Sequence, residues 1–296
     1  MALFKGSGVA IVTPMRENGD VNEEKLGELI DYQISEGTDA IIICGTTGEG
    51  STLSDEEHIA TIAYCVKRVG GRVPVIAGTG SNDTAYSCQL SRAAEIAGAD
   101  ACLLVAPYYN KATQTGLIRH FAATAESVKI PCILYNVPSR TGCNILPETA
   151  VYLAKNCENI TAIKEASGDI AQVAKLAAMA DGCIDIYSGN DDMVVPLMSV
   201  GGIGVISVLA NIAPKATHDM CMSYLDGDIE KAKEIQLSAM GLVDALFCEV
   251  NPIPVKAGLN LQGWEVGSPR LPLTEMEEAH KEVLRAEMEK FGCLNI

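Results

Sequence analysis

The 296-residue sequence is poor in basic residues and in long apolar runs. It has 22 Lys and Arg against 38 Asp and Glu, a formal net charge of −16. A nucleic-acid or anionic-membrane partner requires a basic footprint, so this charge balance argues against both. No apolar stretch approaches the roughly 18 residues of a membrane span, and the N-terminus lacks the apolar segment of a signal peptide. We therefore expect a cytoplasmic protein.

Familiar metal, nucleotide and redox patterns are also missing. The four histidines show no His-x-x-x-His spacing, and the eleven cysteines include no Cys-x-x-Cys pair. No Gly-x-Ser-x-Gly elbow and no complete Gly-x-Gly-x-x-Gly occurs, so nothing indicates a metal site, a nucleophilic serine or a dinucleotide loop. The cysteines are odd in number and many lie in apolar runs, which is typical of reduced, buried thiols.

What the sequence does contain is a regular succession of short apolar runs. Its 48% hydrophobic and 20% charged residues fall in the ordinary globular range. The runs lack polar alternation and are bounded by Gly, Pro, Asn or Thr, as is typical of strands buried on both faces of a parallel sheet. The predicted strands are Val9–Thr13, Ala40–Cys44, Val73–Ala77, Ala101–Ala106, Cys132–Asn136, Thr161–Glu165, Asp185–Ser188 and Gly204–Val208.

Segments with helical periodicity separate these runs, as in Asn22–Glu36 and in Ser54–Val69, which begins with a Ser-x-x-Glu capping box. Eight strands alternating with helices favour a (β/α)8 TIM barrel over a doubly wound open sheet. The strand pattern then stops, and the last three predicted helices are Glu230–Leu246, Ile253–Leu261 and Thr274–Phe291. We expect a catalytic barrel of residues 1–227 and a C-terminal helical domain of residues 228–296.

One lysine, Lys164, lies inside a predicted buried strand, near its carboxyl end. A charged amine is costly in such a place unless it is paired or deprotonated. Desolvation lowers the pKa of a lysine and makes it a nucleophile that can form a Schiff base with a carbonyl. An edge lysine that reaches solvent is the alternative, for which an interior strand leaves little room.

The loop Gly45–Thr52 resembles a Walker A loop, but Ser51 occupies the position of the phosphate-binding lysine. Backbone N–H groups and the hydroxyls of Thr46 and Thr47 can still hold a small anion such as a carboxylate. A tight strand–helix turn that needs glycine explains the pattern equally well, so the motif alone leaves both interpretations open.

Polar residues follow several of the predicted strands. The carboxyl ends of all strands meet at one face of a barrel, so these side chains should gather there. Phenols can relay protons and a guanidinium can bind a carboxylate in bidentate fashion, whereas singly each residue is more often packing or surface. The residues expected at this face are Thr46, Thr47, Tyr109, Tyr135, Arg140 and Lys164.

Together these motifs resemble the 4-hydroxy-tetrahydrodipicolinate synthase (dihydrodipicolinate synthase) family. The resemblance rests on Gly45–Glu49, Pro107–Asn110, Tyr135–Gly142 and the Lys164 strand, in that order. The first and last are shared with the wider pyruvate-dependent aldolases, whereas Tyr135–Gly142 separates this branch from sialic-acid lyases. The resemblance implies a lyase of the class I aldolase type. It would condense pyruvate with L-aspartate-4-semialdehyde, for lysine and diaminopimelate biosynthesis, with no cofactor other than the covalent Schiff base.

The resemblance also implies how pyruvate is held. Lys164 would form the imine with the keto group. Thr46 and Thr47 would hold the pyruvate carboxylate, with help from the backbone near Gly189 and Ile206.

The remaining implied roles concern protons, the second substrate and assembly. Tyr135, Thr47 and Tyr109 would form a proton relay, in which Tyr109 comes from a neighbouring subunit. Arg140 would bind the carboxylate of the aldehyde. The implied assembly is a homotetramer made of two tight dimers.

Two other functions stay open at this point. A sister aldolase, such as a 2-keto-3-deoxy sugar-acid lyase or N-acetylneuraminate lyase, would keep Lys164 but would not require Arg140. A non-catalytic carboxylate-binding module would use the glycine-rich loop without forming any covalent adduct.

Finally, the resemblance bears on feedback by lysine, which inhibits some family members at a site between dimer subunits. Asn82, His58 and Tyr108 match the pattern expected there. Tyr86 stands where a glutamate would bind the ammonium of the ligand, and Asp55 replaces a histidine. An unpaired ammonium in a desolvated pocket is costly, so we expect weak or absent inhibition by lysine.

Overall fold

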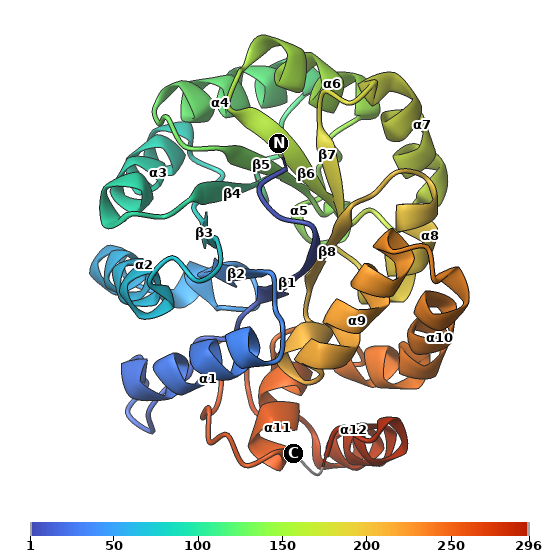
Figure 1. The fold of residues 1–296 in the computed structure, drawn as a ribbon. Helices are drawn as coiled ribbons and strands as arrows, with labels where there is room; N and C mark the ends of the chain where they lie inside the picture. Colours follow the sequence, from blue (N-terminus) through green and yellow to red (C-terminus); the bar gives the residue numbers. More distant parts are fainter. Residues whose placement is uncertain (1, 295–296) are drawn as a thin grey trace.

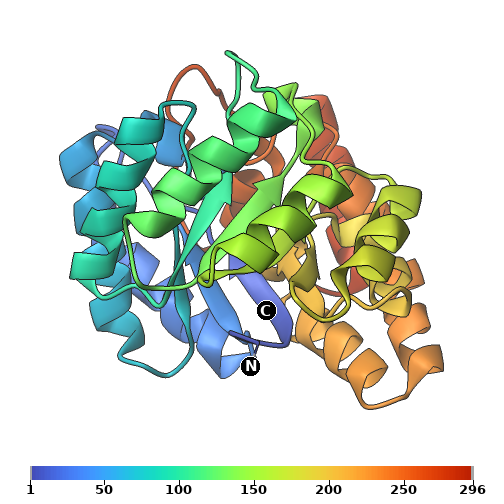
Figure 2. The ribbon, with the colours of Figure 1, turned by 90° about the horizontal axis from the view of Figure 1, so that it is seen from above.

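The structure, a computed structural model, describes residues 2–294. Eight parallel strands form a closed barrel, with each strand hydrogen-bonded to the next and β8 to β1, and helices surround it (Figures 1 and 2). The predicted TIM barrel is therefore confirmed. The strands are β1 (Gly6–Ala10), β2 (Ala40–Ile43), β3 (Val75–Gly78), β4 (Ala101–Val105), β5 (Cys132–Asn136), β6 (Ile160–Glu165), β7 (Asp185–Ser188) and β8 (Gly204–Ser207).

The outer helices follow the strands in chain order. Several begin as the sequence predicts, for example α2, where Ser54 and Glu57 form the capping box. They are α1 (Glu23–Ser35), α2 (Asp55–Val69), α3 (Thr84–Ala97), α4 (Gln114–Glu126), the short α5 (Pro138–Thr141), α6 (Pro147–Asn156), α7 (Ile170–Ala180), α8 (Val194–Ser199) and α9 (Pro214–Leu225).

Three predicted boundaries are wrong. The first strand is Gly6–Ala10 rather than Val9–Thr13, because residues 6–9 pair with β8 and residues 8–10 with β2. Ile11 and Val12 lie past the strand, where Ile11 still donates its N–H to the Ile42 carbonyl at 3.1 Å, and both side chains are buried, so their apolar character reflects packing. β3 begins at Val75, two residues later than predicted, and the last helix begins at Glu278 rather than at Thr274.

The inside of the barrel is filled by side chains, as in other barrels of this kind. At the amino end the Phe4 ring stacks on Tyr187 with 4.4 Å between centroids, and the Tyr187 hydroxyl donates to the Phe4 carbonyl. Both residues belong to the inner apolar cluster. A cavity inside the barrel must therefore open at the carboxyl ends of the strands.

The C-terminal helices α10 (Ile229–Leu246), α11 (Ile253–Leu261) and α12 (Glu278–Phe291) lie along one side of the barrel (Figure 1). The division at residue 227 stays a prediction, because α9 and α10 pack against each other across it. Within residues 2–294, no helix combines the length and apolar character that a membrane span requires.

An ion pair joins these helices to the barrel. Lys256 of α11 donates to Glu49 at 2.6 Å, and both side chains are only 1% exposed. The backbone N–H of Arg270 donates to the other Glu49 oxygen at 2.8 Å. Since Glu49 lies in the loop after β2, the C-terminal segment holds the loop that carries Thr46 and Thr47.

Candidate active site

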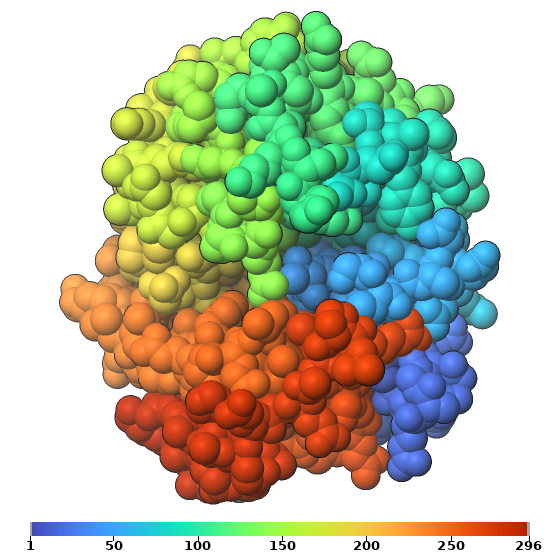
Figure 3. Space-filling view, turned by 180° about the vertical axis from the view of Figure 1, so that it is seen from behind, coloured from blue at the N-terminus to red at the C-terminus, as the bar shows by residue number. Residues whose placement is uncertain are grey.

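The carboxyl ends of the strands enclose a cavity of about 430 Å³. Figure 3 shows this face of the molecule, which is hollowed where the green, blue and orange segments meet. Six of the eight predicted site residues line the cavity, namely Thr46, Thr47, Tyr135, Arg140, Lys164 and Gly189. The convergence of strand ends is therefore observed.

Lys164 is buried in β6, with 5% of its surface exposed. Its Nζ lies 4.4 Å from the centroid of the Tyr135 ring, on the neighbouring strand. Burial lowers the pKa of Lys164 to about 8; Asp191 opposes this shift and Arg140 adds to it. At pH 7 about a tenth of such amines are neutral, against less than about a thousandth for an ordinary lysine.

Gly189, which follows β7, leaves the space that the lysine occupies. A Cβ at this position would lie 2.6 Å from Ala166 Cβ and 2.9 Å from Lys164 Cε. Any side chain at position 189 would therefore displace the Lys164 side chain. Glycine at this position leaves room for Lys164 to lie where it does.

Asp191 is a site residue that the sequence analysis missed, although it follows β7 as the predicted residues follow their strands. Its carboxylate is buried and accepts from Ser207 Oγ at 2.5 Å and from the backbone N–H groups of Val208 and Leu209. Burial raises the pKa of Asp191, and these hydrogen bonds act in the opposite direction. These three hydrogen bonds hold the Asp191 carboxylate in place beside Lys164.

The loop after β2 is a tight turn that needs glycine, and its two threonines also line the cavity. A Cβ at Gly50 would lie 2.3 Å from the Cys44 carbonyl oxygen, so close packing requires glycine there. Thr46 is exposed and Thr47 is buried, and both line the cavity. The tight turn thereby presents two hydroxyls to the same space.

Tyr135 and Arg140 also line the cavity, with Tyr135 close to Thr46 of this loop. Burial raises the pKa of the Tyr135 phenol, although Arg140 and the Thr46 hydroxyl act against it, so the phenol keeps its proton at neutral pH. Arg140 lies in α5 and donates to the Asn251 carbonyl at 3.3 Å. Within residues 2–294 no carboxylate pairs with its guanidinium, which is therefore available to an anion.

Two predicted residues do not line this cavity. Tyr109 is 91% exposed, in the loop between β4 and α4, which projects beyond the helices in Figure 2. Ile206 is buried inside the barrel, and Val208, two residues further along, takes its place in the wall.

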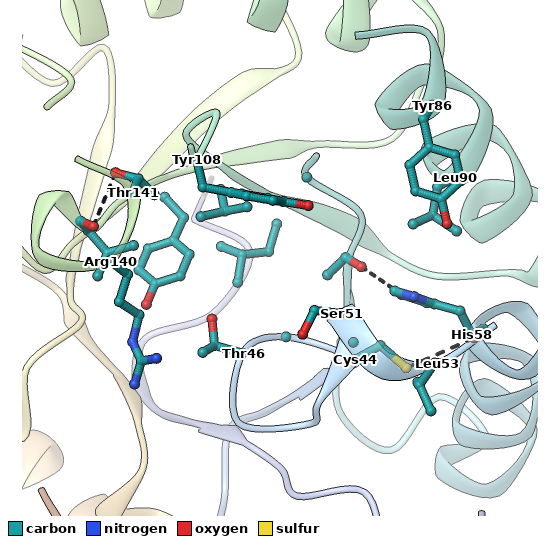
Figure 4. A pocket seen from close by; sticks show the side chains of 18 residues that line it. Cys44, Thr46, Ser51, Leu53, His58, Tyr86, Leu90, Tyr108, Arg140 and Thr141 are labelled. Carbon is teal, nitrogen blue, oxygen red and sulfur yellow. Dashed lines mark hydrogen bonds between the residues drawn. The ribbon is translucent and has the colours of Figure 1, made fainter. Parts of the chain in front are cut away.

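A second cavity of about 460 Å³ adjoins the first and shares Thr46, Tyr135 and Arg140 with it. Figure 4 shows Thr46 and Arg140 toward one end of this cavity and Tyr86 at the other. The Tyr86 hydroxyl donates to Asp55 at 2.7 Å. Burial and the Asp55 carboxylate raise the pKa of Tyr86 to about 12, so this end presents a neutral phenol.

The C-terminal segment supplies further residues that the sequence does not predict. Asp244, Phe247 and Asn251 all line the first cavity, although they lie beyond the eight strands. These residues do not follow a strand of the barrel, so the convergence of strand ends does not predict them. Among residues 2–294 no group of three or more His, Cys, Asp or Glu residues is arranged to hold a metal ion.

We expect the Lys164 amine to titrate near pH 8, well below the ordinary lysine value of 10.5. Because the Asp191 carboxylate raises this pKa, Asp191→Asn should move the midpoint to lower pH, whereas Asp192→Asn at the exposed neighbour should not. The measurement is the rate of acetylation of Lys164 by acetic anhydride across pH, read by peptide mass spectrometry. A midpoint that is the same in both variants would contradict the assigned role of Asp191.

The chain matches known proteins along nearly its whole length. The model of the Dihydrodipicolinate synthetase family matches residues 3–291. A 4-hydroxy-tetrahydrodipicolinate synthase from Lachnoclostridium phytofermentans is 61% identical over 294 residues, which are 99% of this chain and all of the relative.

Solved structures agree with this result. A chloride-inhibited dihydrodipicolinate synthase from Acinetobacter baumannii, complexed with pyruvate, is 46% identical with a TM-score of 0.95, over 98% of this chain and 99% of the other. A structure described as the first monomeric dihydrodipicolinate synthase variant is 41% identical with a TM-score of 0.96, over 99% and 98%. With the fold, the buried lysine and these matches in agreement, the chain belongs to the dihydrodipicolinate synthetase family.

Proposed function

We propose that this chain is a 4-hydroxy-tetrahydrodipicolinate synthase, a lyase that condenses pyruvate with L-aspartate-4-semialdehyde through a lysine Schiff base. Full-length identity of 61% to a relative of that name supports the activity. The observation that carries the mechanism is the buried Lys164 amine, whose pKa of about 8 makes it a nucleophile near neutral pH.

The proposed carbon chemistry begins at Lys164. The Lys164 amine attacks the keto carbon of pyruvate, and loss of water gives an imine whose protonated form acidifies the methyl group. Loss of a methyl proton gives an enamine, which attacks the aldehyde carbon. The amino group of the second substrate then displaces Lys164 and closes the ring. Thr46 and Thr47 hold the pyruvate carboxylate, with backbone near Gly189.

Proton transfers in this scheme pass through hydroxyls. Tyr135 stays protonated at neutral pH because burial raises its pKa, so it can donate to the departing hydroxyl of the carbinolamine. Thr47 links Tyr135 to Tyr109 of a neighbouring subunit. The imine itself withdraws electrons from the methyl group, so the proposed reaction needs no cofactor or metal. The eleven free cysteines suit the reducing cytoplasm, where we place the enzyme.

Lys164→Ala should lower kcat more than about a thousandfold, because it removes the nucleophile. Borohydride in the presence of pyruvate should leave a covalent adduct on the wild-type peptide that contains Lys164 and none on the variant. Lys256 serves as an internal control, because it is equally buried but paired with Glu49. An adduct that persists in the variant would assign the chemistry to another lysine, and its absence in the wild type would favour a binding module.

Arg140→Ala should raise the KM for aspartate semialdehyde roughly ten- to hundredfold, the value of one lost charge-assisted hydrogen bond. The rate of pyruvate adduct formation should change much less, because the imine forms at Lys164. Steady-state kinetics with each substrate varied would measure both effects, with Arg119→Ala, an exposed arginine on α4, as the control. Equal losses for both substrates would mean that Arg140 acts structurally.

We further propose a homotetramer built from tight dimers, with Tyr109 reaching into the site of its dimer partner. The exposure of Tyr109 and the open cavity beside Tyr135 support this arrangement. One relative is described as a monomeric variant, so a direct test of subunit sharing is needed.

Lys164→Ala and Tyr109→Phe should each be nearly inactive alone but regain activity when co-expressed with different tags. A mixed dimer has one site with an intact Lys164 and, from the other subunit, an intact Tyr109, so about a quarter of wild-type activity should return at equal amounts. Purified mixed assemblies would be assayed and sized by sedimentation. No recovery would place Tyr109 outside the partner's site.

We also propose that lysine inhibits this enzyme weakly or not at all. The Asp55 carboxylate, which could bind the ammonium of lysine, already accepts a hydrogen bond from Tyr86. Initial rates should stay within about twofold up to millimolar lysine. Tyr86→Glu, which restores a carboxylate, should increase inhibition most, and Tyr86→Phe, which frees Asp55 from its hydrogen bond, should increase it less. Inhibition of the wild type at submillimolar lysine would show that Asp55 serves instead.

A further inference from the structure

The segment between α10 and α11 crosses the cavity and brings an amide side chain to the site. Asn251 lines the cavity and is only 5% exposed. Its Nδ2 donates to Thr47 Oγ1 at 2.9 Å, across 204 positions of the sequence. Its backbone carbonyl accepts from Arg140 Nη2 at 3.3 Å. One residue of the C-terminal helical region thus contacts two side chains that belong to different barrel loops.

The direction of the first contact has a chemical consequence. A threonine hydroxyl has one hydrogen to donate and lone pairs to accept with. When Thr47 Oγ1 accepts from Asn251, its own hydrogen is left to point toward the cavity, which Tyr135 also lines. If the amide were turned over, its oxygen would accept from Thr47 and draw this hydrogen away from the cavity.

We propose that Asn251 is a positioning residue that fixes the donor direction of the Thr47 hydroxyl and holds Arg140 beside it. This inference rests on the proposed function, in which Thr47 passes protons between tyrosines. Asn251 does not touch the reacting atoms; it acts through Thr47 and Arg140.

The surrounding contacts keep Asn251 at a constant distance from Thr47. Glu49, two residues after Thr47, is paired with Lys256, five residues after Asn251, and both side chains are excluded from water. Asn251 also lies within a turn, which is closed by a hydrogen bond from the Ile253 N–H to the Val250 carbonyl. The two segments are therefore fastened together next to the hydrogen bond itself, which favours a maintained geometry over a chance contact.

The amide oxygen supports a role specific to the Nδ2 group. Within residues 2–294, Asn251 Oδ1 is buried and has no hydrogen-bond partner. Of the two polar groups of the amide, Nδ2 therefore has the defined side-chain partner, and that partner is the Thr47 hydroxyl.

Asn251→Asp tests the donor, because a carboxylate has the same shape but only accepts. At pH 8 we expect kcat to fall roughly ten- to hundredfold, with the KM for pyruvate changed less than about threefold. At lower pH the buried acid gains a proton and can donate again; burial raises its pKa, and the Arg140 guanidinium, which contacts the backbone carbonyl of the same residue, acts in the opposite direction. The ratio of variant to wild-type kcat should therefore rise as pH falls.

Asn251→Leu supplies a side chain of similar size without hydrogen bonds, and it should show the loss without the recovery at low pH. Asn260→Asp is the matched control, because Asn260 bonds only the Gly267 carbonyl and the Val266 N–H, away from the cavity. We expect its kcat to follow the wild type at every pH. Melting temperatures of all variants would be compared at one protein concentration.

The proposal is overturned if Asn251→Asp keeps wild-type kcat, or if its loss equals that of Asn251→Leu at every pH. Borohydride trapping with pyruvate separates these results from failure of the proposed function. A wild-type protein that forms the Lys164 adduct while Asn251→Asp behaves normally rejects the role of Asn251 alone. A wild-type protein that forms no adduct rejects the proposed mechanism itself.

Discussion

The rest of this structure depends on one constraint, which is that the Lys164 amine is almost fully excluded from water at the carboxyl end of a closed barrel. Lowering the pKa of Lys164 from its ordinary value to about 8 corresponds to about 3 kcal/mol against the charged amine. The folded protein carries this cost below pH 8 and loses it as pH rises through 10.5, where the unfolded lysine also becomes neutral. Gly189 provides room for the side chain, Tyr135 covers it with a ring face, and Asp191 limits how far the pKa falls.

Most of this arrangement follows from the order of residues along the chain. In a parallel barrel every strand ends at the same face, so a residue placed just after a strand arrives there whatever the details of packing. That rule suffices for Thr46, Thr47, Tyr135 and Lys164, and it applies equally to Asp191, which was overlooked. It fails at Ile206 because the rule gives the face but not how deep each residue lies.

The rest could not be predicted because it depends on contacts between distant segments. Asn251 meets Thr47 only because the chain returns across the cavity after the barrel has closed, and no periodicity or local motif encodes that return. The Lys256–Glu49 pair is of the same kind. At β1 the difficulty was different: buried residues beyond the strand are as apolar as those within it, so composition placed the strand three residues late.

The net charge of the protein bears on how Arg140 can bind a substrate carboxylate. Both proposed substrates carry a carboxylate, yet the chain has a net charge of −16, so its overall field opposes their approach. At physiological salt this field is screened beyond roughly 8 Å, so a carboxylate inside the cavity interacts mainly with the charges directly beside it. Arg140 can attract a carboxylate because no acidic side chain among residues 2–294 pairs with it. The Asn251 carbonyl, a neutral acceptor, holds the guanidinium without cancelling its charge. An aspartate or glutamate side chain in the same place would hold it as firmly and remove its attraction for substrate.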